Sequence, residues 1–319
     1  ITQRPLNLSG SRAYDSTRTA SGSDLSFTNI VSGETLGLTG SGVLDSPAAG
    51  GRTIVNTNTL AISDGSGIAS NYTLTNGTLT MTIVPRSTTV SGTKTYDGTT
   101  NVASSNLTSF SNLAGSDTLS LSGTGTMSSA DVGTGKTVNT SGLTIDNSSG
   151  VGSNYTLSAA TVNVTERVIG LSGVRAFDGT NNASSTDLSI SNLVSGENLT
   201  LSGSGTVPNA TVEMNKAITL GSLSISDGSG GKSSNYTLTG GSHTLDISQL
   251  SVNVTGSRQY DGTKTVNSSD LNLTNLVSGE TVSLTGAGTV ADENVGANKT
   301  VTAGSLALTG PGAGNYTLS

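Results

Sequence analysis

The sequence contains no cysteine and no tryptophan, and its only histidine is His243. Without cysteine, the chain can form neither disulfides nor thiolate metal sites. A nucleophile–histidine–acid triad needs a histidine at every site, and His243 has no counterpart elsewhere in the chain. We therefore expect His243 to be a surface or loop residue, and we expect the protein not to be an enzyme.

Charge and long apolar runs are also scarce. Charged residues make up 11% of the chain, and the net charge is −7. A chain of this kind lacks the basic stripe that binds phosphate, so we expect no nucleic-acid partner. No apolar run approaches the length of a membrane span or of a signal peptide.

Small and polar residues are abundant instead, with 43 glycines and many Ser, Thr and Asn among 319 residues. Short runs nevertheless alternate β-branched or apolar residues with polar ones, as in Thr78–Val84, Thr161–Thr165 and Leu250–Thr255. Alternation with a period of two is typical of half-buried strands. The composition therefore predicts an all-β protein and not a disordered linker.

Two short motifs recur at the same interval. The sequence Asn-Tyr-Thr-Leu recurs at separations of 83, 81 and 80 residues, and an aromatic-Asp pair recurs at 82, 81 and 83. Two independent markers with one period indicate a tandem array. We place repeat 1 at residues 1–84, repeat 2 at 85–166, repeat 3 at 167–249 and repeat 4 at 250–319. We expect structural roles for the motif residues Tyr14, Asp15, Tyr96, Asp97, Phe177, Asp178, Tyr260, Asp261, Asn71, Tyr72, Asn154, Tyr155, Asn235, Tyr236, Asn315 and Tyr316.

The few charges keep their sign from repeat to repeat. One basic residue stands just before each aromatic-Asp pair, as Arg12, Lys94, Arg175 and Arg258 do. Two bases and two acids per repeat suggest pairing, which at a surface contributes about 0–1 kcal/mol and chiefly fixes loop geometry. The other members, which we expect to form structural ion pairs, are Arg52, Lys136, Lys216, Lys299, Glu34, Asp117, Glu197 and Glu280.

The order of motifs within each repeat resembles a known family. Tyr-Asp-Gly-Thr, Val-Ser-Gly-Glu, a Lys-Thr-Val segment and Asn-Tyr-Thr-Leu follow one another as in the YDG-type repeat domains of large, secreted, filamentous-haemagglutinin-like bacterial adhesins. The resemblance covers all four repeats. Two departures stand out, because Ser16 replaces the glycine in repeat 1 and Phe177 replaces the tyrosine in repeat 3. Phenylalanine has no hydroxyl, so we expect this aromatic position to serve the core.

The turn residues suggest how a repeat folds. Asp-Gly after a strand predicts a tight turn. In Asp64–Leu74 a glycine-rich turn precedes a tyrosine that begins a strand, as at the corner of an immunoglobulin-like sandwich. We expect four immunoglobulin-like β-sandwich repeats of about 80 residues, each with its last two strands paired as a hairpin. The alternatives are a β-solenoid, whose shorter subperiod we do not find, and a β-grasp fold, which needs a helix.

Acidic residues raise the question of bound calcium. Ser63–Gly67, Ser226–Gly230 and Ile145–Gly150 supply oxygen ligands, whereas the matching Leu308–Gly314 contains no acid. The spacing fits neither an EF-hand loop nor a calcium-binding nonapeptide repeat. We expect no cofactor and no repeated calcium site, with at most an adventitious calcium ion at a repeat junction.

The two ends of the chain fall within repeats. Ile1–Gly10 aligns with Ile83–Gly92, and only Ser319 follows the last Asn-Tyr-Thr-Leu. We therefore expect the sequence to be part of a longer chain and repeat 4 to lack its terminal strand. The sequence leaves open whether such a strand would come from the same chain or from a neighbour.

The resemblance implies a stalk or filament segment of an extracellular adhesin at the bacterial cell surface, serving cell-surface or biofilm-matrix attachment. The expected partners are adjacent repeats of the same polypeptide, together with neighbouring filament subunits or surface glycans. An array of carbohydrate-binding modules is the alternative. Such modules need exposed aromatics for sugar stacking, and Phe27 and Phe110 are among the few candidates.

Overall fold

The computed structural model describes residues 1–318, and their regular structure consists of β-strands and short 3-10 turns. This confirms the all-β prediction. The described residues contain no α-helix, which a β-grasp fold would require. The chain divides into two compact units, Ile1–Thr165 and Glu166–Ser319, each of which spans two repeats.

The first unit holds repeats 1 and 2. The strands of repeat 1 are β1 (Arg4–Pro5), β2 (Leu8–Ala13), β3 (Thr19–Ser21), β4 (Leu25–Phe27), β5 (Leu36–Thr39), β6 (Ser41–Leu44), β7 (Gly50–Asn56), β8 (Ala61–Asp64), β9 (Tyr72–Thr73) and β10 (Thr80–Val84). Those of repeat 2 are β11 (Arg86–Thr95), β12 (Asn101–Ala103), β13 (Leu107–Ser111), β14 (Leu119–Thr126), β15 (Gly133–Val138), β16 (Leu143–Asn147) and β17 (Tyr155–Thr165).

The second unit holds repeats 3 and 4. The strands of repeat 3 are β18 (Arg167–Val168), β19 (Gly170–Ala176), β20 (Asn182–Ser184), β21 (Leu188–Ser191), β22 (Leu199–Ser202), β23 (Ser204–Thr206), β24 (Glu213–Ala217), β25 (Ser224–Asp227), β26 (Tyr236–Thr237) and β27 (His243–Ser248). Those of repeat 4 are β28 (Leu250–Gly256), β29 (Thr265–Asn267), β30 (Leu271–Thr274), β31 (Ser283–Thr285), β32 (Ala287–Thr289), β33 (Ala307–Thr309) and β34 (Tyr316–Leu318).

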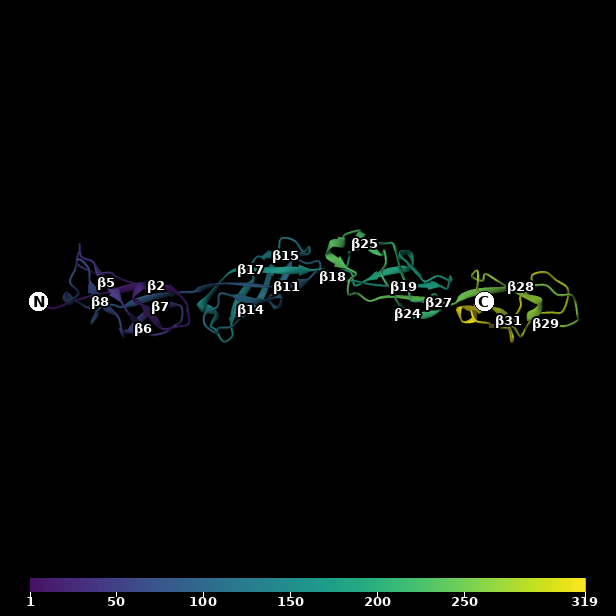
Figure 1. The fold of residues 1–319 in the computed structure, drawn as a ribbon, viewed down its shortest axis with the longest axis horizontal. Coiled ribbons are helices and arrows are strands. Elements are labelled where there is room, and N and C mark those ends of the chain that lie inside the picture. Colours follow the sequence, from purple (N-terminus) through teal and green to yellow (C-terminus); the bar gives the residue numbers. More distant parts are fainter. Residues whose placement is uncertain (319) are drawn as a thin grey trace. The chain divides into compact units, whose positions relative to one another are not determined.

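Repeat 2 shows the strand plan most completely (Figure 1). One sheet has the order β13-β11-β17-β15, and a second has the order β12-β14-β16. The long strands β11 and β17 run parallel from Arg86↔Tyr155 to Thr95↔Thr165. The sheet β21-β19-β27-β24 of repeat 3 follows the same order. These sheets are small and mix parallel with antiparallel pairs, so the immunoglobulin-like sandwich stays a prediction.

The predicted hairpin between the Asn-Tyr-Thr-Leu strand and the last strand is wrong. Tyr72 pairs in parallel with Arg4 of β1, and Tyr316 pairs in parallel with Leu250 of β28. In repeat 2 the two segments form the single strand β17. A hairpin would need the chain to reverse between the two segments, whereas here both lie in the same direction beside the first strand of the repeat.

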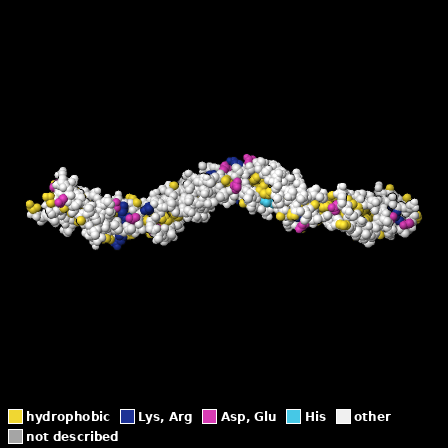
Figure 2. Space-filling view, viewed as in Figure 1, with side chains coloured by type: hydrophobic (Ala, Val, Ile, Leu, Met, Phe, Trp, Pro, Cys, Tyr) yellow, Lys and Arg dark blue, Asp and Glu magenta, His cyan; other side chains and the backbone are white. Residues whose placement is uncertain are grey.

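Alternating apolar residues of the first and last strands form the core of repeats 1 to 3. In the first strands Leu8, Val90 and Leu171 are at most 2% exposed. Each last strand of repeats 1 to 3 buries two apolar residues that are separated by one polar residue. These buried pairs are Met81 and Ile83, Val162 and Val164, and Leu245 and Ile247. The outward-facing residues between them are polar, and the surface in Figure 2 accordingly consists mostly of uncharged polar side chains and backbone, with charges in small groups.

The aromatic-Asp-Gly-Thr motif forms one turn in all four repeats. The Asp15 carboxylate accepts hydrogen bonds from the Thr17 amide and from the Thr17 hydroxyl, each at 2.8 Å. The same pair of bonds joins Asp97 to Thr99, Asp178 to Thr180 and Asp261 to Thr263. The third motif position has a positive φ, between 74° and 78° where it is Gly98, Gly179 or Gly262, and 66° where it is Ser16. Only glycine adopts this conformation without steric cost.

Replacing Ser16 by glycine should stabilise repeat 1 by about 1 kcal/mol, because it relieves a left-handed conformation that costs an L-residue about 1–2 kcal/mol. We expect the most protected amides of β2 and β7 to exchange about fivefold more slowly in native-state hydrogen exchange. Ser9→Gly, in the extended middle of β2, is the matched control and should destabilise the same repeat by about 0.5–1 kcal/mol. Equal effects of both changes would refute the assignment of strain to Ser16.

Candidate functional site at the junctions between repeats

The Asn-Tyr-Thr-Leu motif lies at one end of each repeat. In repeats 2 and 4 it contacts the preceding repeat, and we call such a contact a junction. The asparagines of the motif end 3-10 turns (Ala69–Asn71, Gly152–Asn154, Ser233–Asn235 and Ala313–Asn315), and the following tyrosines begin strands, as predicted. The Tyr155 hydroxyl donates to Asp117 Oδ2 at 2.7 Å and accepts from the Ala114 amide at 3.0 Å. Tyr236 likewise donates to Glu197 at 2.8 Å, and Tyr72 donates to Glu34. A buried tyrosine thus bonds a half-buried carboxylate at this end of repeats 1 to 3.

In the first unit the aromatic-Asp motif of repeat 1 docks on this pair of repeat 2. The Tyr14 ring meets the Tyr155 ring edge to face, with centroids 5.4 Å apart and an interplanar angle of 76°. The Tyr14 hydroxyl also donates to Asp117 Oδ2, at 3.0 Å. One carboxylate oxygen therefore accepts hydrogen bonds from tyrosines of two successive repeats.

Backbone contacts and apolar packing extend this junction. The Asn154 side chain, 3% exposed, accepts a hydrogen bond from the Ala49 amide at 2.8 Å. The Arg86 guanidinium donates to the Tyr14 carbonyl at 3.3 Å. Tyr14 and Tyr155 belong to one buried cluster with Leu8 and Ile83 of repeat 1 and Ala114 of repeat 2. The hydrophobic core therefore continues from one repeat into the next.

The second unit builds the junction between repeats 3 and 4 from the equivalent residues. The Phe177 and Tyr316 rings are 5.4 Å apart at 79°. The Asn315 side chain accepts from the Val212 amide at 3.1 Å, as Asn154 does from Ala49. Phe177 is 3% exposed and has no hydroxyl to donate, so the ring itself is the shared element. At Phe177 this aromatic therefore packs against the following repeat.

The aromatic-Asp motifs differ in exposure along the chain. Tyr14, Tyr96 and Phe177 are at most 5% exposed, whereas Tyr260 of repeat 4 is 64% exposed. Tyr260 therefore presents the same aromatic face without the packing that covers it in the other repeats.

The first basic set closes the loop that follows each aromatic. Arg12, Lys94 and Arg175 form ion pairs with the aspartates three residues later, as does Arg258 with Asp261. The Lys94 ammonium, 6% exposed, also donates to the Thr99 carbonyl at 2.9 Å and the Thr99 hydroxyl at 3.0 Å. The hydrogen bonds from Arg258 and then from Thr263 lower the pKa of Asp261 to about 2. These charges are structural, because their partners lie within one loop.

The second basic set does not pair with the predicted acids. Arg52 donates to the carbonyls of Ala48 and Ala49, and Lys136 donates to the Asp131 carbonyl. Lys216 pairs with Glu213, and Lys299 pairs with Asp292. Glu34, Asp117 and Glu197 bind tyrosine hydroxyls instead, and Glu280 lies against Gly312. The pairing was mispredicted because the basic residues find oxygens in their own preceding loops, much nearer than the distant acids.

Few groups among residues 1–318 could carry chemistry. No three His, Cys, Asp or Glu side chains gather as a metal site would require. The lone His243 is not the surface or loop residue that we expected, because it is half-buried and begins β27, paired with Leu171. Its Nε2 atom lies 2.8 Å from the Leu238 carbonyl. No helix of this range is long and apolar enough to cross a membrane.

Sequence reasoning recognised the motif residues but missed that they meet across repeats. The missed partners are backbone amides, those of Ala49 and Val212, which carry no side-chain signal. One usable signal was present. Asparagine precedes the tyrosine in every copy of the motif, although the 3-10 turn alone does not require a polar residue there.

Comparison with protein families shows that one family model matches each of the four repeats. The family described as "YDG domain" matches residues 2–81, 77–163, 165–244 and 247–319, which confirms four tandem repeats. The comparison with curated proteins finds no match to the chain.

Replacing Tyr14 by alanine should loosen the junction between repeats 1 and 2, because it removes the edge-to-face contact, about 0.5–1.5 kcal/mol beyond area burial, and the bond to Asp117. We expect the Ala49 amide to exchange about tenfold faster in hydrogen-exchange measurements. Tyr14→Phe keeps the ring and should have the smaller effect. In the control Tyr260→Ala, the Val212 amide should be unchanged. Equal exchange at Ala49 in Tyr14→Ala and the parent chain would show that the ring does not hold the junction.

The same tyrosines should make the first unit sensitive to alkali. Burial, followed by the hydrogen bond to Asp117, raises the pKa of Tyr155 to about 12 and also raises the pKa of Tyr14. A tyrosine whose folded pKa exceeds the unfolded value of about 10 contributes stability below pH 10 that is lost as the pH rises towards 12. Unfolding followed against pH by circular dichroism should show this loss. Tyr155→Phe should flatten the dependence over that interval, and an unaltered dependence would contradict the assignment.

Proposed function

The chain belongs to the YDG domain family, and from that premise we propose that it is a non-enzymatic stalk or filament segment of an extracellular bacterial adhesin. Its role is mechanical. The repeats hold a distal adhesive part away from the cell surface, or link cells within a biofilm matrix. The proposal extends to the two-sheet sandwich as the architecture of each repeat and to neighbouring filament subunits or surface glycans as partners.

One observation carries this proposal: residues that recur in every repeat meet where repeat 1 contacts repeat 2 and where repeat 3 contacts repeat 4. Tyr14 contacts Tyr155 and Asp117. Phe177 contacts Tyr316. The motif residues of one repeat thus bind the motif residues of the next. A repeated active site would instead gather its recurring polar groups around a pocket within each repeat. The recurring polar groups here face tyrosine hydroxyls, loop carbonyls and a neighbouring backbone.

The junction geometry suits a load-bearing element. Each described junction combines an aromatic contact with an asparagine side chain bound to the backbone of the preceding repeat. Hydrogen bonds and packing that span two repeats resist bending at the linker, which between β10 and β11 is the single residue Pro85. A surface rich in uncharged polar groups and poor in apolar patches keeps such a segment solvated.

The alternative, an array of carbohydrate-binding modules, has weaker support. Phe27 and Phe110 are half-buried, and both lie in strands that pair with the first strand of their repeats. A sugar-stacking site needs an aromatic face open to solvent. The counterparts of Tyr260, the exposed aromatic of repeat 4, are at most 5% exposed, so exposure at that position does not recur.

We expect small-angle scattering of the full chain to give an elongated particle with the cross-section of a single repeat. The double variant Tyr14→Ala/Phe177→Ala removes both described aromatic junctions and should broaden the distribution of interatomic distances while leaving the circular dichroism unchanged. Tyr14→Phe is the matched control and should scatter like the parent. A compact particle would overturn the stalk. Saturable binding on a glycan array, lost in Tyr260→Ala, would favour the carbohydrate-binding alternative.

A further inference from the structure

The Lys216 side chain of repeat 3 ends among oxygen atoms of residues 209–213. Lys216 is 4% exposed and pairs with Leu245, which is fully buried, so both side chains lie on the core face of the sheet. The Lys216 ammonium contacts the side-chain oxygen of Asn209 and lies 3.2 Å from the Asn209 carbonyl oxygen. It also lies 3.2 Å from a Glu213 carboxylate oxygen. An amine, a carboxamide and a carboxylate thus meet at one place.

Asn209 begins a turn that all four repeats share. Its side-chain oxygen accepts a hydrogen bond from the Thr211 amide at 3.1 Å. The equivalent residues of the other repeats accept from the amide two residues later in the same way, and they are Ser46, Ser129 and Asp292. A serine hydroxyl is sufficient for this turn. The turn therefore does not require the carboxamide of Asn209.

The three groups occur together at these positions in repeat 3 and in no other repeat. The residues in the position of Lys216 are Arg52, Lys136 and Lys299. The residues in the position of Glu213 carry no charge, and they are Ala49, Gly133 and Gly296. The combination in repeat 3 is therefore not a requirement of the fold that the repeats have in common.

The contacts of Asn209 favour attack at its carboxamide carbon. The Oδ1 atom is bonded to Cγ, so a nitrogen in hydrogen-bond contact with Oδ1 needs only a small displacement to reach the near-attack distance of about 3–3.5 Å from Cγ. The Thr211 amide and the Thr211 hydroxyl both donate to this same Oδ1. Donors placed in this way stabilise the negative charge that develops on the oxygen when a nucleophile adds to the carbon.

Glu213 provides the base that the lysine needs. An ammonium has no free electron pair, so a proton must leave before the nitrogen can attack. In a regular strand, residues three apart point to opposite faces, but a bulge in β24 lies between Glu213 and Lys216 and brings the two side chains together. The Glu213 side chain is 61% exposed, so a small leaving group has a route to solvent.

We propose that Lys216 and Asn209 form an isopeptide bond within repeat 3, with Glu213 as the proton carrier. Glu213 takes a proton from the Lys216 ammonium, and the freed amine attacks Cγ of Asn209. The Nζ–Cγ bond forms and the Cγ–Nδ2 bond breaks. Two of the three Nζ protons pass through Glu213 to Nδ2, which leaves as ammonium, and the Glu213 carboxylate is regenerated.

The bond joins the turn at Asn209 to β24, the outermost strand in the order β21-β19-β27-β24. An outermost strand has a hydrogen-bonded neighbour on one side only, so a covalent bond at Lys216 opposes its detachment. The inference is independent of the proposed stalk function, because it concerns a bond within one repeat.

The test is mass spectrometry of the full chain. The intact mass should fall short of the mass expected from the sequence by one ammonia. After unfolding, trypsin should not cleave at Lys216, whose amine has become an amide, so residues 176–232 should appear as one peptide in place of 176–216 and 217–232. A full mass with normal cleavage would refute the bond. Loss of ammonia with normal cleavage at Lys216 would also refute it, because a cyclic imide at an asparagine gives that result.

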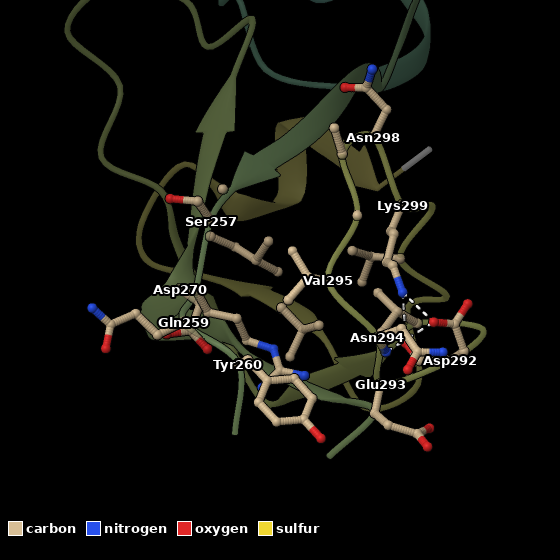
Figure 3. Close-up of a pocket in the computed structure, with 18 of the residues that line it drawn as sticks. Ser257, Gln259, Tyr260, Asp270, Asp292, Glu293, Asn294, Val295, Asn298 and Lys299 are labelled. Carbon is tan, nitrogen blue, oxygen red and sulfur yellow. Dashed lines mark hydrogen bonds and ion pairs between the residues drawn. The ribbon is translucent and has the colours of Figure 1, made fainter. Parts of the chain in front are cut away.

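Repeat 4 supplies a control in the same digest. Lys299 contacts the Asp292 carboxylate and lies 3.1 Å from the Asp292 carbonyl (Figure 3). It thus meets an acid where Lys216 meets an amide, and Gly296 stands in the position of Glu213. The Glu293 carboxylate points away from Lys299 in Figure 3. Trypsin should therefore cleave normally after Lys299.

Two substitutions introduce residues that sister repeats carry at the same positions, so both variants should fold. Asn209→Ser removes the carboxamide, and Lys216→Arg replaces the amine by a guanidinium that stays protonated. Each variant should have the full mass expected from its sequence and an unchanged circular dichroism spectrum. A missing ammonia in Asn209→Ser would overturn the proposal.

Glu213→Gln tests the proton carrier. It keeps the size of the side chain but removes the base, and loss of a positioned base typically slows a reaction by about 10²–10⁴-fold. The fraction of freshly expressed chain that yields the joined peptide 176–232 should therefore fall far below that of the parent. Cross-linking of this variant to the same extent as the parent would show that Glu213 does not carry the proton.

Discussion

The parallel pairing between the first long strand and the last strand is the interaction on which the rest of each repeat depends. The last strand lies inside the sheet, so it satisfies the backbone of two neighbours at once and contributes two apolar side chains to the core. Repeat 4 shows the effect of its absence from the described residues. There the segment 292–301, which is equivalent to β7, β15 and β24, is not a strand. Four apolar residues of this repeat are half-buried: Val254, Leu271, Val290 and Val301. These repeats are rich in glycine and poor in aromatic residues, so each core contains few apolar side chains. A single strand that contributes two of them therefore determines whether the core is shielded from solvent.

The scarcity of apolar residues also explains the junctions. A chain with 3% aromatics places Tyr14, Tyr155 and Tyr316 where two repeats share them. The Asp117 carboxylate, which is half-buried, accepts hydrogen bonds from Tyr155 of its own repeat and from Tyr14 of the preceding one. The basic residues stay within their own loops, where carbonyl oxygens surround them at little cost in side-chain ordering. Charge therefore shapes the loops, and aromatic packing joins the repeats.

The all-β class and the four repeats could be predicted from the sequence, because period-two alternation and recurrence are visible in one dimension. Strand direction was harder. The hairpin prediction failed because Tyr155–Thr165 reads equally well as two antiparallel strands or as one long strand, and only the partner Arg86–Thr95 distinguishes them. The ion-pair prediction for Arg52 and Lys136 failed because backbone carbonyls, their actual partners, are present at every residue and leave no pattern. The contact between repeats could not be predicted, because nothing in the sequence spacing of Tyr14 and Tyr155 indicates that their rings touch.

The shared carboxylate at Asp117 also has a consequence for how such proteins change in length. The face that presents Tyr14 or Phe177 differs from the face that receives it, so the contact is heterologous and has a direction. A heterologous contact does not close on itself, and each repeat carries both of its halves. Duplication or deletion of a whole repeat in the gene would therefore recreate the same contact at the new boundary without any compensating substitution. The number of repeats can thus be changed by recombination alone, one repeat at a time.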